Sequence, residues 1–539
     1  MPYNSGAPLK SIYKTVTITY PMLIIITTSL LFLTASALLI LRFTRPNFRY
    51  FWLTAAGGAL LAWISTWLWQ ARMPLEFQLL PWQPAELFVD YPSFLADGIS
   101  WPLALSLTTL AVAVILTATV RTDLNDPLAS VGTLILTGFG VLAVTANNPL
   151  TLVLVWAAID ISELIILLSL ADEPRSSERV VTAFSTRAAG IGLVLWANIV
   201  SVANHTPMTF TSIPPQAGLF LLIGAGLRLG VLPLHLPYPS ESSLRRGSGT
   251  ALRLIAAASS LVLLARIPTE SVQSILTPFL LVLATFAGLY AGWTWLRAPD
   301  ELSGRPFWMI GMASLAVTSA LRGNAIGAAA WSCALVLAGG ALFLSSVQYL
   351  WFNRALMIGA IGLSALPLSL TASGWLSNAE VFWPVWPFML AVQALLVAGY
   401  IRHALRPGMR DSFESQQIWS RNVYPAGIVI LLLTTLLLGL FGWDGAATVG
   451  VWIIGIIASL LTLGLVWAIP RLRILNPIRA HWVRPATSWL ENLYRGLWDL
   501  YQWLARLSRV ISSTLEGDGG IMWTLLFLAL FISLMTQGK

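Results

Sequence analysis

Long apolar runs, separated by short polar segments, occupy most of the chain. A run of roughly 17 to 25 apolar residues is long enough to cross a bilayer as a helix, and by that measure we expect about sixteen transmembrane spans. They are predicted to begin near Tyr20, Tyr50, Gly98, Asp126, Pro149, Val180, Ala217, Gly249, Gln273, Pro306, Ala325, Ala355, Val381, Asn422, Ala446 and Gly520. The pattern therefore predicts an all-α polytopic membrane protein.

The distribution of arginine supports the same count. Cytoplasmic loops of membrane proteins carry an excess of basic residues. In this chain the arginines concentrate in the odd-numbered connections, whereas the even-numbered connections hold only Arg72, Arg266 and Arg322. A missed or an extra span would scramble this alternation. We therefore expect a multi-pass protein of the plasma membrane or cell inner membrane, with both termini on the outer (periplasmic) side.

Composition excludes soluble enzymes and nucleic-acid binders. Hydrophobic residues make up 57% of the 539 positions and charged residues 10%, whereas a soluble domain carries about 25% charged residues. The net charge of +8 is accounted for by arginines in the predicted cytoplasmic loops, so we expect lipid and no nucleic acid around the chain. The single cysteine, Cys333, excludes an internal disulfide, and the scattered histidines form no metal-ligand spacing. No cofactor motif is present, so no cofactor is expected.

One segment near the C-terminus differs from the apolar runs. Over 484–516, apolar residues three and four positions apart alternate with charged ones, which is the pattern of an amphipathic helix. About 32 residues at 1.5 Å per residue would extend roughly 48 Å. Such a lateral helix is either an interfacial anchor or a long brace across a helix bundle, and a final span is predicted within 517–539.

The run Ala217–Pro239 combines a charge with a helix break. It carries Arg228 near its middle, and Pro233 and His235 further along. A charged side chain at membrane depth is tolerated where it faces a protein interior or a water-filled cavity, and a broken span is typical of transport paths. A buried structural arginine in a kinked helix is the other interpretation of this run.

Few ionisable residues fall inside the other predicted spans. Asp160 and Glu163 are three positions apart and share one helical face. Two uncompensated carboxylates in lipid are unfavourable, so we expect them to face the arginines of neighbouring spans, or one of them to be protonated. The candidate partners are Arg187, Arg228 and Arg253. The set is either an ion relay or a group of salt bridges that holds helices in register.

Six short motifs follow one another along the chain: FLADGIS from Phe94, AAIDISELIILL from Ala157, TAFSTRAAG from Thr182, GLRLGVLPLHLPYP from Gly226, TALRLIAAAS from Thr250 and GWLSNAEVF from Gly374. Taken in order, they resemble motifs of the antiporter-like membrane subunits shared by respiratory complex I, Mrp-type antiporters and membrane-bound hydrogenases. In this resemblance Asp160 stands at the position of a key glutamate and Arg228 at that of a lysine. The predicted lateral helix resembles that of the largest, distal subunit type.

The resemblance implies two inverted five-helix repeats, each with a broken helix. The corresponding division of the chain is 1–125 (N-terminal helices), 126–267 and 268–402 (the repeats), 403–483 (C-terminal helices), 484–516 (lateral helix) and 517–539 (final span). It also implies partner subunits of a complex I-like or hydrogenase-like assembly and no cofactor in this chain. Candidates for a proton or ion path are Asp160, Glu163, Arg187, Arg228, His235, Arg253, Asn378 and Glu380.

Departures from the family pattern leave three functions open. Arginine does not release its proton as lysine can, Asn378 cannot titrate, and no acidic, basic or histidine residue lies between Arg322 and Arg354. The first hypothesis is a membrane-arm subunit that couples redox chemistry in partner subunits to ion translocation, with conduction impaired by these changes. The second is a non-conducting scaffold with the same fold. The third is an ion-coupling subunit of an inorganic-carbon uptake system.

Overall fold

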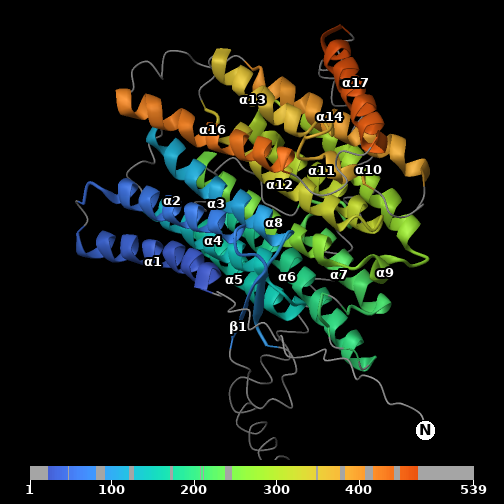
Figure 1. The fold of residues 1–539 in the computed structure, drawn as a ribbon, viewed down its shortest axis with the longest axis horizontal. Helices are drawn as coiled ribbons and strands as arrows, with labels where there is room; N and C mark the ends of the chain where they lie inside the picture. Colours follow the sequence, from blue (N-terminus) through green and yellow to red (C-terminus); the bar gives the residue numbers. More distant parts are fainter. Residues whose placement is uncertain are drawn as a thin grey trace, which may run out of the picture. The chain divides into compact units, whose positions relative to one another are not determined.

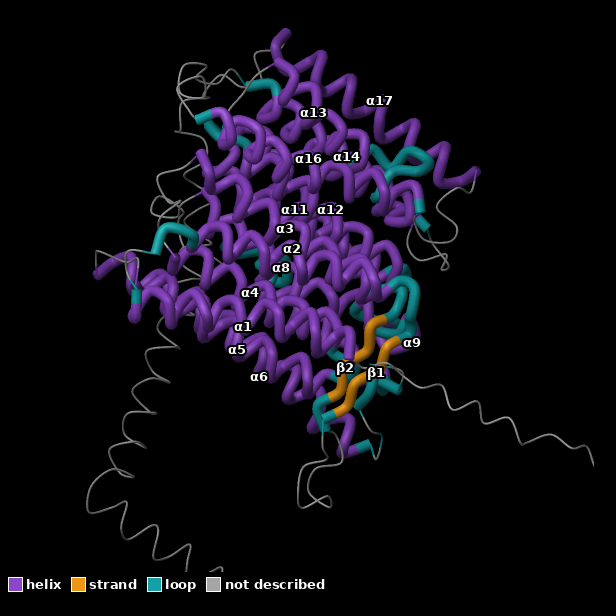
Figure 2. Tube along the Cα trace, turned by 60° about the vertical axis from the view of Figure 1, so that its left-hand side comes forward, coloured by secondary structure: helices purple, strands orange, loops and turns teal. Residues whose placement is uncertain are grey.

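The computed structural model is built almost entirely from helices (Figures 1 and 2). It describes residues 22–471 except 46–47, 80–90, 121–126, 170–173, 205, 207, 211, 237–245, 347–349, 377–382, 407–416 and 442–448. Within these residues, twelve helices are long and apolar enough to cross a membrane. This confirms the predicted fold class of a polytopic α-helical membrane protein. The predicted lateral helix and final span lie outside the described residues.

The N-terminal part contains a helix that is buried at the centre of the bundle. Its elements are α1 (Met22–Thr44), α2 (Phe51–Trp69), β1 (Leu75–Gln78), β2 (Ser93–Ala96), α3 (Ser100–Thr117) and η1 (Ala118–Val120). Almost every residue of α3 is buried, because α2, α4, α8, α12 and α16 all pack against it. Asp97, three residues before the start of α3, accepts a hydrogen bond from the Ser100 amide at 2.8 Å.

A short β-hairpin lies beside the helices (Figure 2). Strands β1 and β2 pair antiparallel, with Leu75 opposite Ala96. The sequence pattern gave no signal for them, since four residues are too few for an alternation of apolar and polar positions to stand out. The hairpin is therefore a small correction to the purely helical expectation.

The first group of core helices contains an interrupted span. Its members are α4 (Pro127–Thr145), α5 (Pro149–Ser169), α6 (Pro174–Ala203), α7 (Pro215–Arg228) and α8 (Arg246–Arg266). Helix α7 has only 14 residues, and at 1.5 Å per residue it covers about 21 Å, less than the roughly 30 Å hydrocarbon core. A turn with a positive-φ glycine, Gly230, follows its last residue. The expected break in this span is therefore present.

The second group has a short helix at the corresponding place. Its elements are α9 (Thr269–Val272), α10 (Thr277–Arg297), α11 (Glu301–Leu321), α12 (Ala325–Leu344), α13 (Leu350–Gly362), η4 (Ala372–Trp375), η5 (Trp383–Val385) and α14 (Trp386–Ala404). Helix α13 has 13 residues and precedes an irregular stretch, as α7 does. The two inverted repeats and their boundaries stay predictions.

Helices α16 (Ile418–Leu440) and α17 (Val449–Arg471) follow. Helix α16 packs against α3, and Gly427 permits the approach, because a Cβ there would lie 3.0 Å from the Ala113 carbonyl oxygen. The two groups of core helices meet where α8 packs against α12, and both of these helices are buried along nearly their full length. Each predicted span up to the one near Ala446 coincides with a described helix.

Candidate functional site: a buried ion-pair network

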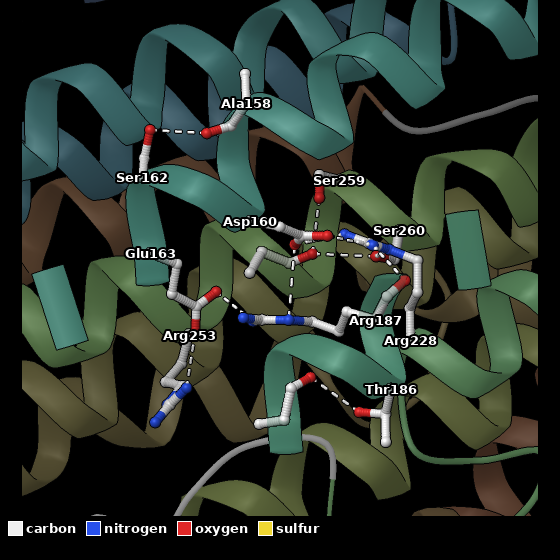
Figure 3. A network of polar contacts seen from close by, with 12 residues as sticks. Ala158, Asp160, Ser162, Glu163, Thr186, Arg187, Arg228, Arg253, Ser259 and Ser260 are labelled. Carbon is white, nitrogen blue, oxygen red and sulfur yellow. Dashed lines mark hydrogen bonds and ion pairs between the residues drawn. The ribbon is translucent and has the colours of Figure 1, made fainter. Parts of the chain in front are cut away.

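Asp160 and Arg228 form a two-point ion pair in the protein interior (Figure 3). Asp160 lies on α5, and Arg228 is the last residue of α7. The two terminal nitrogens of Arg228 donate to the two carboxylate oxygens of Asp160, Nη1 to Oδ2 at 2.6 Å and Nη2 to Oδ1 at 2.9 Å. This parallel geometry is the strongest way for a guanidinium to bind a carboxylate.

The rest of the Arg228 side chain is also satisfied. Its Nε donates to Ser260 Oγ on α8 at 3.1 Å, and Nη1 donates to the Arg187 carbonyl on α6 at 3.1 Å. The guanidinium carbon lies 4.3 Å from the centre of the Trp156 ring, a cation–π contact. Gly190 makes room for this side chain, since a Cβ there would come within 2.5 Å of Arg228 Cγ. Four helices therefore converge on one buried charge.

Glu163, one turn further along α5, is held by two other arginines. Arg253 Nη1 on α8 donates to Oε1 at 2.9 Å, and Arg187 Nη1 on α6 donates to Oε2. Arg187 Nε also lies 3.6 Å from Asp160 Oδ1. Figure 3 shows Arg187 between the two carboxylates. The expectation that Asp160 and Glu163 face the arginines of neighbouring spans is confirmed.

The network is almost completely shielded from solvent. The side chains in its ion pairs are at most 2% exposed. Three guanidinium groups face two carboxylates, so the network carries one excess positive charge when both carboxylates are ionised. Arginine has no acceptor and keeps its proton in proteins. Asp160 and Glu163 are therefore the members of this network that can take up a proton.

The other candidate residues are not brought into this network. His235 is partly buried, and its Nδ1 lies 2.9 Å from the Pro233 carbonyl oxygen, a local contact within the turn after α7. Asn378 and Glu380 lie outside the described residues. Across the described part of the chain, no group of three or more His, Cys, Asp or Glu side chains could hold a metal ion.

A second polar cluster was missed by the sequence analysis. Glu301, at the start of α11, lies 2.6 Å from Arg246 Nη2 and 3.4 Å from Arg406 Nη1. Nearby, Arg305 is fully buried inside α11 and donates to Thr250 Oγ1 at 2.9 Å. These arginines belong to the odd-numbered connections, which the sequence pattern predicts to be cytoplasmic loops. A charged residue at the end of a span can point back into the helix bundle, and nothing in the sequence between Arg297 and Arg305 indicates that Arg305 does so.

The fold and the network define a class: a polytopic helical membrane protein with interrupted spans and fixed charges in its interior. The chain resembles a chain in the structure of the Mrp complex from Dietzia sp. DQ12-45-1b, with a TM-score of 0.66, 14% sequence identity and 96% of this chain covered. It spans 63% of that chain. It also resembles a chain of the membrane-bound sulfane sulfur reductase, an archaeal respiratory membrane complex, with a TM-score of 0.64, 12% identity, and 94% of this chain and 99% of that chain covered.

These likenesses confirm the predicted resemblance at the level of fold. The second structure is described as that of a respiratory membrane complex. No protein-family profile matches the sequence, and no curated protein matches it. The chain therefore shares its fold with these two chains, although its sequence is only 14% and 12% identical to theirs.

Proposed function

We propose that this chain is an ion-translocating, antiporter-like subunit of a multisubunit membrane complex of the complex I-like or hydrogenase-like type. Partner subunits carry the redox chemistry, and this chain responds with charge movement in the network of α5, α6, α7 and α8. It lies in the inner or plasma membrane with both termini outside. The shared fold with subunits of the Mrp complex and the sulfane sulfur reductase supports the proposal.

The observation that carries the proposal is the position of Arg187. It contacts Glu163 and lies 3.6 Å from Asp160, while each carboxylate has a second arginine of its own. Two unit charges about 4 Å apart interact by about 4 kcal/mol at an effective dielectric constant of 20. If Glu163 takes up a proton, Arg187 loses that attraction and Asp160 becomes its nearest ionised partner. A proton at one carboxylate is thereby coupled to the position of a charge beside the other.

The experiment uses the whole complex, purified from its native membrane in mild detergent and reconstituted in vesicles. Asp160→Asn should abolish ion movement measured with an internal pH dye, while the redox turnover of the partner subunits continues. The control is Glu270→Gln, because Glu270 is an exposed carboxylate on α9 outside the network. Unchanged ion movement in Asp160→Asn, at equal subunit content, would contradict the assigned role.

A non-conducting scaffold is the second candidate, and the arginine content of the network favours it. Three arginines hold two carboxylates in place, which suits a rigid connection between helices better than a proton relay. A scaffold predicts that Asp160→Asn leaves ion movement intact and instead lowers the yield of assembled complex. Measuring the yield and the ion movement on the same preparation separates the two functions.

A further inference from the structure

Arg322 is a buried arginine with an unusual environment. It follows the last residue of α11 and stands two residues before Asn324, the residue that caps the start of α12. Arg322 is only 1% exposed to solvent. The other fully buried arginines described above have a carboxylate or a hydroxyl as a partner. Arg322 differs from all of them.

No described residue accepts a hydrogen bond from Arg322. Its Nε, Nη1 and Nη2 are all buried without an acceptor. The guanidinium stacks on an aromatic ring: its central carbon lies 4.3 Å from the centre of the Trp386 ring. Burying an unpaired charge is among the most unfavourable arrangements in a protein, and buried donors nearly always have a partner. The guanidinium therefore requires an acceptor that these residues do not supply.

The acceptors near Arg322 on this side are already used. Asn324 donates to the carbonyls of Ser373 and Leu376, and its own side-chain oxygen accepts from the Gly327 amide. The N-terminus of α12, three residues beyond Arg322, contributes the partial positive charge of a helix start. That partial charge makes this end of α11 and α12 favourable for a negative charge.

A second buried hydrogen-bond donor without an acceptor lies on the neighbouring helix α12. Trp331 Nε1, on α12, is buried with no hydrogen-bond partner and faces Gly374, where a Cβ would lie 2.4 Å from that nitrogen. The next residue, Trp375, packs its ring 5.4 Å from the Trp386 ring that lies against Arg322. The contacts thus connect two unsatisfied donors through one group of aromatic side chains.

We propose that Arg322 binds a small planar oxyanion of the carboxylate type. A guanidinium stacked on an aromatic face keeps its edges open, and each edge presents two parallel N–H groups that match the two oxygens of a carboxylate. A spherical halide can accept hydrogen bonds from one such edge, but it has no pair of oxygens to match the two parallel N–H groups. The site is separate from the Asp160–Glu163 network and does not depend on the function proposed for it.

The test measures the unfolding temperature of the full-length purified protein during separate titrations with sodium formate and sodium chloride at matched ionic strength. Formate should raise the unfolding temperature saturably, by roughly 2 to 4 °C at one hundred times its dissociation constant. Chloride should give a smaller rise. The rise should be lost in Arg322→Gln, weakened in Arg322→Lys, which keeps the charge without the planar fork, and retained in Arg72→Gln, an exposed arginine outside this region.

Three outcomes would overturn the proposal. The first is the absence of a formate-specific rise in the unaltered protein, and the second is an equal rise in Arg322→Gln. The third concerns Glu380, which lies outside the described residues: if Arg322→Gln and Glu380→Gln lower the unfolding temperature equally in the absence of formate, a carboxylate of the chain itself pairs with Arg322. The inference instead expects Arg322→Gln to be at least as stable as the unaltered protein in formate-free buffer, because the variant buries no unpaired charge.

Discussion

Removing the Asp160 carboxylate tests whether the network is a structural necessity. We consider Asp160→Ala, which deletes both carboxylate oxygens that accept from Arg228, and Asp160→Asn, which keeps one of these oxygens. In the first variant the guanidinium loses its contacts at 2.6 Å and 2.9 Å and stays buried. Breaking a buried ion pair by removing one partner costs about 3 to 5 kcal/mol. Asparagine preserves one oxygen, so we expect about half of that loss.

The contacts that survive set the size of the effect. Arg228 still donates to Ser260 Oγ and to the Arg187 carbonyl, and it still lies over the Trp156 ring. These contacts keep the side chain in place, so the network has little freedom to relax. A charge that cannot move toward water carries the full penalty of losing its counter-charge. The cost of Asp160→Ala should therefore fall near 4 kcal/mol rather than near zero.

The assay is a double-mutant cycle on the protein purified in detergent. Asp160→Ala, Arg228→Met and the double variant are compared by their denaturant midpoints, and the coupling energy isolates the pair from other effects. We expect Asp160→Ala to be much less stable than the double variant, since it leaves Arg228 buried without its counter-charge. Arg228→Met should be affected less, because Arg187 Nε still lies 3.6 Å from Asp160 Oδ1. A coupling energy below about 0.5 kcal/mol would refute the reasoning, because residues that do not interact are additive within that range.

Two further predictions concern other parts of the bundle. Glu301→Gln should destabilise the protein by about 1 to 2 kcal/mol in the same denaturation assay. Glu301 is buried and Arg246 is partly exposed, so their ion pair should contribute more than an exposed pair and less than a fully buried one. No measurable change in stability would contradict this prediction. Gly218→Ala should cost about 1 to 3 kcal/mol, since its Cβ would lie 2.1 Å from the Ser271 carbonyl oxygen. Gly57→Ala is the matched control: nothing lies within 4 Å of a Cβ there, so it should stabilise the helix by up to about 1 kcal/mol.

Hydrophobic run length predicted the helices because the bilayer imposes one dominant constraint on each span. Hydropathy is a poorer guide for the predicted spans near Pro306 and Ala355, and the structure gives a reason. Helix α11 carries buried Arg305 and an internal proline, and α13 stops after 13 residues. Neither is among the helices that are long and apolar enough to cross a membrane by themselves. Hydropathy therefore underestimates a span that carries a buried charge or that is interrupted after a short helix.

The sequence predicted which charged residues form the network, but not which arginine pairs with which carboxylate. The spacing of Asp160 and Glu163 placed both on one face of α5, and the cost of buried charge required arginines opposite them. Which arginine pairs with which carboxylate depends on how α6, α7 and α8 cross α5, and no sequence pattern encodes those crossing points. Ser260 and Trp156 complete the Arg228 environment, yet both resemble ordinary membrane-helix residues in the sequence.

Among the described residues, buried arginines outnumber buried carboxylates. In the first group of helices three buried arginines face two carboxylates, and in the second group Arg305 donates to the Thr250 hydroxyl while the three guanidinium nitrogens of Arg322 have no acceptor. Because arginine keeps its proton, this positive charge is permanent and does not vary during any cycle. Protonation of Asp160 or Glu163 would change the charge of the first group, and the oxyanion proposed for Arg322 would change that of the second. A mechanism for this chain can therefore use its carboxylates, a bound anion or the described histidines His235 and His403, whereas its arginines cannot pass a proton between them.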